Sequence, residues 1–184
     1  MQDVQPRFGY SDLLAMPEDG RRYEIHGGEL VVVPSPMPCH QIAVTELLML
    51  LCDYGRRAGG IAVVAPLDIV FDEHDVVQPD IVFFRAERRH LVRPYEVTRV
   101  APDIAVEVLS PSTAAVDRGR KMRMFAGYGV PECWIVDPVR LRIEVHALEN
   151  GAYRCAQAAT GGDIVRSVLL PDLAFAADGI FPFA

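Results

Sequence analysis

Hydrophobic residues recur along this chain with two different periods, and their alternation predicts a mixed α/β fold. Residues 10–16, 40–58 and 113–128 repeat with the helical period, and glycine follows each of the last two segments. Shorter apolar runs rich in β-branched residues and bounded by glycine, proline or aspartate predict strands. The strands are expected at 23–26, 29–33, 61–71, 76–84, 104–109, around 134, and at 142–148, 153–158 and 164–169.

The central elements follow one another as helix, three strands, helix and strand, an αβββαβ order. Helix 113–128 joins two buried strands, and such a crossover connection allows them to pair in parallel. The expected fold class is therefore α/β (α+β), with a mixed β-sheet flanked by helices and extra hairpins at the N- and C-terminal ends. No repeat, low-complexity segment or linker interrupts the chain, so we expect residues 1–184 to form a single domain.

An acidic residue interrupts the most apolar of the predicted strands. Glu107 stands in the run 104–109, which should otherwise be dry on both faces. Burying an unpaired carboxylate is costly, so this position needs a cation, a hydrogen-bond network or an opening to solvent. Two interpretations stay open: a satisfied structural acid near a strand end, or a functional acid.

The helix that follows carries a lysine on its apolar side. At about 100° per residue, Lys121 shares one side with Met124, Phe125 and Tyr128. We therefore expect Lys121 to point inward, toward the layer that holds Glu107. The alternative is an ion pair between Asp117 and Lys121 at i, i+4 on a partly wet flank.

A second acid lies inside the predicted strand 76–84. Gln78, Asp80 and Val82 share one face of that strand, and four apolar residues follow Asp80 directly. Pro79 removes a backbone donor, which suggests a sheet edge or a bulge at this point. Two carboxylates and an amine, each within an apolar element, form a set that solubility does not explain.

Composition is ordinary for a soluble globular domain, with 51% hydrophobic and 23% charged residues. No apolar stretch approaches the length of a membrane span, and Met1–Ser11 lacks the pattern of a signal peptide. We therefore expect a cytoplasmic protein with no membrane partner. The four cysteines are widely spaced, and we expect free thiols.

The net charge of −7 argues against a large nonspecific nucleic-acid surface. It does not exclude a small basic patch. Arginines and lysine cluster in two places, after strand 76–84 and on helix 113–128, and both clusters are also explained as solvated faces. The members are Arg85, Arg88, Arg89 and Arg93, and Arg118, Arg120, Lys121 and Arg123.

Four stretches of the chain resemble the PD-(D/E)XK restriction-endonuclease-like superfamily, and in particular its Uma-type branch of restriction endonucleases. They carry a Pro-Asp pair, an acid on the next strand and a nearby lysine, and they cover most of residues 10–140. The stretches are YEIHGGELVVVPSPMPCH (23–40), VVQPDIVFF (76–84), PDIAVEVLSPST (102–113) and KMRMFAGYGVPECWIVDP (121–138).

The resemblance implies a restriction-endonuclease-like core and metal-dependent hydrolysis of DNA. Asp80, Glu107 and the backbone carbonyl of Val108 would then hold Mg²⁺ or Mn²⁺, and Lys121 would orient the attacking water or the phosphate. Glu24 occupies the Tyr-Glu position of the family and joins the candidate catalytic residues. One departure stands out, because the superfamily's usual lysine position is Leu109 here.

Three further residues are candidates with simple alternatives. His40 matches the family motif, but a histidine at a helix start is also a common hydrogen-bonding residue. Glu46 falls mid-helix, where it also fits the polar stripe of an amphipathic helix. Asp68 shares a face with Val70 and is either an acid behind the site or a bulge residue beside Pro66.

Two other functions compete with the nuclease. The acidic pI near 5.2 and the missing lysine at Leu109 favour a catalytically inactive nuclease-fold module that serves dimerisation or partner binding. A metal-dependent hydrolase of another phosphoester would use the same site. Strand edges exposed by the terminal hairpins make a homodimer a further expectation.

Overall fold

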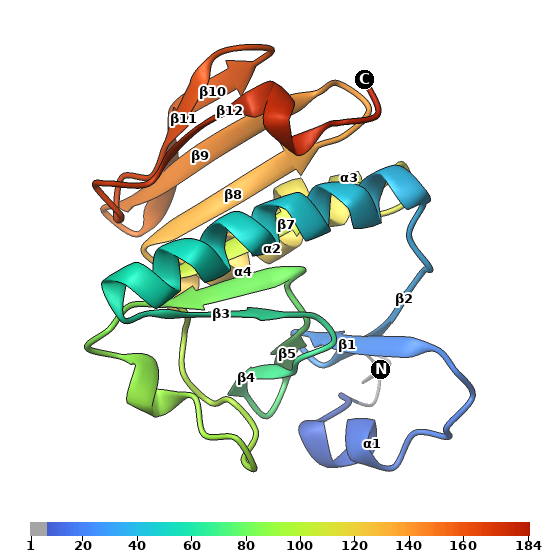
Figure 1. The fold of residues 1–184 in the computed structure, drawn as a ribbon. Helices are drawn as coiled ribbons and strands as arrows, with labels where there is room; N and C mark the ends of the chain where they lie inside the picture. The colour runs from blue at the N-terminus through green and yellow to red at the C-terminus, as the bar shows by residue number, and fades with distance from the viewer. Residues whose placement is uncertain (1–6) are drawn as a thin grey trace.

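The structure, a computed structural model, describes residues 7–184 and is drawn in Figure 1. Residues 1–6 lie outside the described part. The expectation that Met1–Ser11 is not a signal peptide therefore falls mostly on residues that the structure does not describe. The helices are α1 (Tyr10–Leu14), α2 (Pro38–Ala58), η1 (Arg89–Leu91), α3 (Ala114–Val116), η2 (Asp117–Lys121), α4 (Met122–Gly127) and η3 (Ala177–Ile180). The strands are β1 (Arg22–His26), β2 (Glu29–Val33), β3 (Ile61–Val64), β4 (Ile69–Asp72), β5 (Asp75–Val77), β6 (Ile81–Phe84), β7 (Ile104–Val108), β8 (Glu132–Asp137), β9 (Arg142–Glu149), β10 (Ala152–Thr160), β11 (Ile164–Arg166) and β12 (Ala174–Ala176).

A six-stranded mixed sheet forms the centre, in the order β10-β9-β8-β7-β6-β3. Strands β7 and β8 pair in parallel, and the other neighbours pair antiparallel. The helical segment between β7 and β8 supplies the crossover that a parallel pair requires. Fold class and the αβββαβ order are thereby confirmed, with α2, β3, β6, β7, the helical segment and β8 as the core.

The N-terminal hairpin does not extend this sheet but joins a second one, in the order β2-β1-β5-β4. The pattern predicted 61–71, with a bend at Pro66, and 76–84 as single strands, but each divides between the two sheets. The breaks fall around Pro66 and Pro79, where the missing N–H donor interrupts a ladder. A hydrogen bond of 3.0 Å from Ala65 N–H to the Asp80 carbonyl joins the two crossing segments. Asp80 therefore lies at the junction of the sheets rather than inside a strand.

Helices cover both faces of the six-stranded sheet (Figure 1). On β7, Val106 faces the cluster that includes Leu47 of α2, whereas Ala105 faces the cluster that includes Phe125 of α4. Side chains alternate along a strand, so Glu107 lies on the same face as Ala105, toward α3, η2 and α4. Full burial of a side chain such as Phe125 stabilises the fold by about 1.5–3 kcal/mol and holds this helical segment against the sheet.

The predicted helix 113–128 is present but is not uniformly α-helical. A π-helical turn, η2, separates α3 from α4 and contains Asp117 and Lys121, both buried. Its wider i→i+5 bonding changes the i, i+4 alignment of these two residues, and such turns occur often at functional sites. The segment ends before Gly129, whose φ of 75° suits the residue after a helix terminus. Within residues 7–184 no helix is long and apolar enough to span a membrane.

Candidate active site

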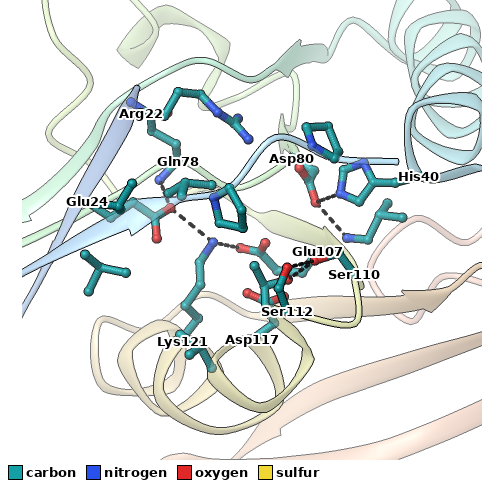
Figure 2. Close-up of a pocket in the computed structure, with 18 residues that line it drawn as sticks. Arg22, Glu24, His40, Gln78, Asp80, Glu107, Ser110, Ser112, Asp117 and Lys121 are labelled. Carbon is teal, nitrogen blue, oxygen red and sulfur yellow. Dashed lines mark hydrogen bonds and ion pairs between the residues drawn. The ribbon is translucent and has the colours of Figure 1, made fainter. Parts of the chain in front are cut away.

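A cavity of about 110 Å³ lies where the two sheets meet η2 (Figure 2). Four elements supply its charged residues: Glu24 from β1, Asp80 from the junction before β6, Glu107 from β7 and Lys121 from η2. The structure therefore brings together the four candidate side chains that the sequence scatters over almost a hundred positions. A cavity of this volume has room for several waters, a hydrated ion or a phosphate group.

Lys121 is the cation at the centre of the acids. Its Nζ donates a hydrogen bond of 3.2 Å to Glu24 Oε1 and lies 2.7 Å from Glu107 Oε1. Within the described chain these two acids, and not Asp117, are its ion-pair partners. Burial would lower the pKa of Lys121, but Glu107, Glu24 and Asp117 outweigh it and raise that pKa. Lys121 is thus held as an ammonium ion.

Glu24 is fixed by three donors. Its Oε1 accepts the backbone N–H of Gln78 at 2.7 Å as well as the Lys121 ammonium, and its Oε2 lies 2.9 Å from His26 Nε2. Burial raises the pKa of Glu24, but Lys121, His26 and the Gln78 N–H together lower it to about 2. At neutral pH Glu24 is therefore a carboxylate that links β1 to the β5–β6 junction and to η2.

Glu107 is the least satisfied of the acids. Its Oε1 is buried and, although Lys121 Nζ is near, has no donor aligned for a hydrogen bond among residues 7–184. Burial raises the pKa of Glu107 well above its usual range; Lys121 opposes this shift, and the neighbouring acids Asp117, Asp80 and Glu24 add to it. This carboxyl group has the strongest need of an additional cation.

Asp80 is anchored to the end of β7. Its Oδ2 accepts the Val108 N–H at 2.8 Å and lies 3.3 Å from His40 Nε2 in the first turn of α2. In an extended strand the N–H and C=O of one residue point to the same edge, so the Val108 carbonyl also faces the Asp80 side. Burial lowers the pKa of His40, but its bond to Asp80 and the charge of Asp80 outweigh this and raise that pKa. His40 thus lies within ion-pair distance of a candidate ligand at the start of its helix.

The donor set suits a hard divalent cation. Four carboxylates line the cavity, from Glu24, Asp80, Glu107 and Asp117, against the two cations Lys121 and Arg22. No cluster of three or more His, Cys, Asp or Glu side chains with metal-binding geometry occurs between residues 7 and 184. An ion here would therefore depend on two carboxylates, a carbonyl, water and substrate phosphate, which is how Mg²⁺ commonly binds. Oε1 of Glu107, which accepts no aligned hydrogen bond from residues 7–184 beside its ion pair with Lys121, supports this fit.

The remaining candidates lie outside the cavity or behind it. Glu46 is half-buried on α2 and does not line the cavity. Asp68 accepts a hydrogen bond of 2.8 Å from Gln78 Nε2, so it contacts the site only through a residue of the cavity wall. Leu109, at the place of the usual lysine, packs in the apolar cluster around Phe125.

The arginines of both basic clusters are largely engaged in intramolecular pairs. Arg85 and Arg88 bind the buried Asp103 at 3.2 and 3.0 Å. Arg118 forms an ion pair of 2.7 Å with Glu144. These arginines connect elements of the fold and do not line the cavity.

Two features of the site escaped the sequence patterns. Arg22 lines the cavity, and the only available signal was its position two residues before Glu24, which places both on one face of a strand. Gln78 holds Glu24 through its backbone N–H, a role that leaves no trace in residue type.

Comparisons with known proteins agree with the fold and place the chain in a family. A family model, Uma2, described as "putative restriction endonuclease", matches residues 10–178. A solved structure titled as that of a putative nuclease belonging to DUF820 from Anabaena variabilis ATCC 29413 superposes with a TM-score of 0.79 at 19% identity, covering 95% of this chain and 97% of the other. The search of curated proteins found no match. Because the family model spans most of its length, the chain belongs to the Uma2 family.

Proposed function

We propose that this protein is a Mg²⁺- or Mn²⁺-dependent endonuclease that hydrolyses phosphodiester bonds of DNA. The observation that carries the proposal is the convergence of Glu24, Asp80, Glu107 and Lys121 on one small cavity (Figure 2). The family's description and the name of the similar structure support the same activity.

Asp80, Glu107 and the Val108 carbonyl are the proposed ligands of the ion. Asp80 is held by the Val108 N–H and by His40, so its carboxylate is oriented before an ion arrives. Glu107 has Lys121 as its one ion-pair partner in the described chain, so its carboxylate retains capacity to bind an ion. When bound, the divalent ion supplies Lewis-acid stabilisation of the charge that develops on the phosphate.

Lys121 is proposed to act as a cation and hydrogen-bond donor rather than as a base, because its raised pKa keeps it protonated. Its ammonium group would donate to a phosphate oxygen or to the attacking water. Glu24 is the proposed positioning residue, because it holds Lys121 and the Gln78 backbone at once. The amine reaches Glu107 from η2, so Leu109 in the strand does not by itself rule out catalysis.

The direct test is cleavage of plasmid and branched DNA with Mg²⁺ or Mn²⁺ by the wild type, Asp80→Asn and Glu107→Gln. Mutating a residue that only hydrogen-bonds a metal ligand typically lowers metal affinity or activity by about 10- to 100-fold. Because Asp80 and Glu107 are proposed to bind the ion directly, we expect either substitution to lower the cleavage rate by about 100-fold or more. Glu46→Gln is the matched control, because it removes a carboxylate outside the cavity. Thermal melting verifies that each variant is folded.

Equal rates for the wild type and both cavity variants would refute the assignment. No cleavage, together with no effect of Mn²⁺ on melting, would favour the binding module without activity. Cleavage of another phosphoester instead of DNA would support the same catalytic residues but assign the protein a different substrate.

Cytoplasmic location and a homodimer stay predictions. Strands β3 and β10 end the six-stranded sheet, and an exposed edge offers backbone groups for pairing between copies. Light scattering coupled to size-exclusion chromatography tests the homodimer directly.

A further inference from the structure

Arg22 is the second cation of the cavity, and its environment differs from that of every other half-buried arginine in the described chain. It stands at the start of β1, and the strand's period of two places it on the same face as Glu24. Figure 2 shows Arg22 and Lys121 reaching the cavity from different elements, β1 and η2.

The half-buried arginines among residues 7–184 are Arg22, Arg85, Arg88 and Arg120. Arg85 and Arg88 bind Asp103, and Arg120 binds Glu29 at 2.6 Å and the His26 carbonyl at 2.7 Å. Arg22 alone in this group has no carboxylate or carbonyl within hydrogen-bond or ion-pair distance. The donors of this guanidinium therefore remain available to an anion that enters the cavity.

The nearby acids do not supply that partner. Glu24 and Glu107 are engaged with Lys121, and Asp80 with His40 and the Val108 N–H. The cavity thus contains acids for a divalent ion, one lysine held between two of them, and one arginine whose donors are free.

We propose that Arg22 binds a phosphate group of the DNA strand that enters the cavity. This inference rests on the proposed function and adds the residue that holds the substrate. A guanidinium suits the role because its planar fork of donors matches two phosphate oxygens, whereas an ammonium acts as a point charge. Arg22 and the divalent ion then share the substrate's negative charge, while the carboxylates hold the ion.

The competing explanation is that Arg22 only offsets the repulsion among the acids. The two roles predict different effects of removing Arg22 on DNA affinity and on stability. Removing a phosphate-binding arginine weakens DNA binding but leaves Mn²⁺ affinity unchanged or tighter, because a positive charge beside the ion is lost. Removing a structural counter-charge lowers stability and leaves DNA affinity at the wild-type level.

The experiment compares Arg22→Ala, Arg22→Lys and the control Arg21→Ala. Arg21 precedes Arg22, carries the same charge, and its side chain is 66% exposed beside Asp19, outside the cavity. Binding of a short fluorescein-labelled duplex is measured by anisotropy with Ca²⁺ in place of the catalytic ion, and Mn²⁺ binding is measured by calorimetry. Melting temperatures and cleavage kinetics with Mg²⁺ are recorded for the same proteins.

We expect Arg22→Ala to weaken duplex binding by about 10-fold or more, since hydrogen bonds to charged groups are among the stronger ones. The salt dependence of the duplex association constant of Arg22→Ala should be shallower than that of the wild type, by the amount that corresponds to about one phosphate contact. Arg22→Lys should recover part of the affinity, and Arg21→Ala should stay near the wild type. In cleavage assays the loss should appear in KM at least as much as in kcat.

Duplex affinity and KM unchanged in Arg22→Ala would overturn the inference, as would a wild type that binds no duplex. A lower melting temperature with unchanged duplex affinity would assign Arg22 the structural role instead. If the wild type cleaves DNA and Arg22→Ala has unchanged duplex affinity and KM, this inference is refuted and the proposed function is not. Duplex binding that depends on Arg22 without any cleavage supports Arg22 and refutes the nuclease.

Discussion

Replacement of Lys121 by methionine tests the charge arrangement of the cavity most sharply. Lys121 is 4% exposed, and its partners Glu24 and Glu107 are each 3% exposed, so solvent screens their interaction little. Removing one partner of a buried ion pair costs about 3–5 kcal/mol, because the other charge stays buried alone. For a chain of this length about 1 kcal/mol changes Tm by roughly 2–4 °C, so Tm should fall by roughly 6–20 °C.

A second substitution separates the charge effect from lost packing. In Lys121→Met the carboxylates of Glu24 and Glu107 stay buried without their ammonium partner. Adding Glu107→Gln removes one of these two charges, so the double variant should be more stable than Lys121→Met by about 1–3 kcal/mol. Urea unfolding followed by fluorescence is a suitable assay, because Trp134 is the sole tryptophan of the chain and is fully buried.

The effect should also depend on pH with a defined sign. Burial already raises the pKa of Glu107, and loss of the Lys121 charge raises it further. The folded variant then binds a proton more tightly than the unfolded chain, so the destabilisation shrinks as pH falls from neutral toward the usual value of 4.5. A Tm for Lys121→Met within about 2 °C of the wild type, or a double variant no more stable than the single one, would refute the charge arrangement.

Three further predictions follow from neighbouring contacts. At a free Mn²⁺ concentration of about 100 Kd the wild type should gain about 2.7 kcal/mol and roughly 5–11 °C in Tm, whereas Asp80→Asn should gain little; differential scanning fluorimetry measures both. Because the pKa of Glu24 is lowered from 4.5 to about 2, its contribution is present above about pH 4.5 and lost as pH falls toward 2. Glu24→Gln should therefore be less stable than the wild type by up to about 3 kcal/mol at neutral pH, and urea unfolding should show that difference vanishing in acid. Asp103→Asn should lose about 1–3 kcal/mol through its bonds to Arg85 and Arg88, with Mn²⁺ binding by calorimetry unchanged.

The fold was largely predictable because its core elements carry strong local patterns. The run 104–109 and the helical period of 113–128 predicted a buried strand and its crossover, and the structure contains both. The division of 61–71 and 76–84 between two sheets was not predicted. A proline can bend a strand or end its pairing, and which of these happens depends on distant partners such as β1, which pairs with β5.

The candidate site was partly predictable for a similar reason. Asp80, Glu107 and Lys121 stood out because a charge within an apolar element needs a partner. Arg22 gave no such contrast, since an arginine before a strand is ordinary, and its lack of a partner is visible only in three dimensions. The π-helical turn that orients Lys121 toward Glu107 and Glu24 also has no simple sequence signal.

Anomalous diffraction from crystals soaked in Mn²⁺ tests the central claim most directly. The claim predicts a peak in the cavity within bonding distance of Asp80, Glu107 and the Val108 carbonyl, and no peak in Asp80→Asn crystals under the same conditions. A wild-type map without density there at millimolar Mn²⁺, with Glu107 still bound only to Lys121, would contradict it.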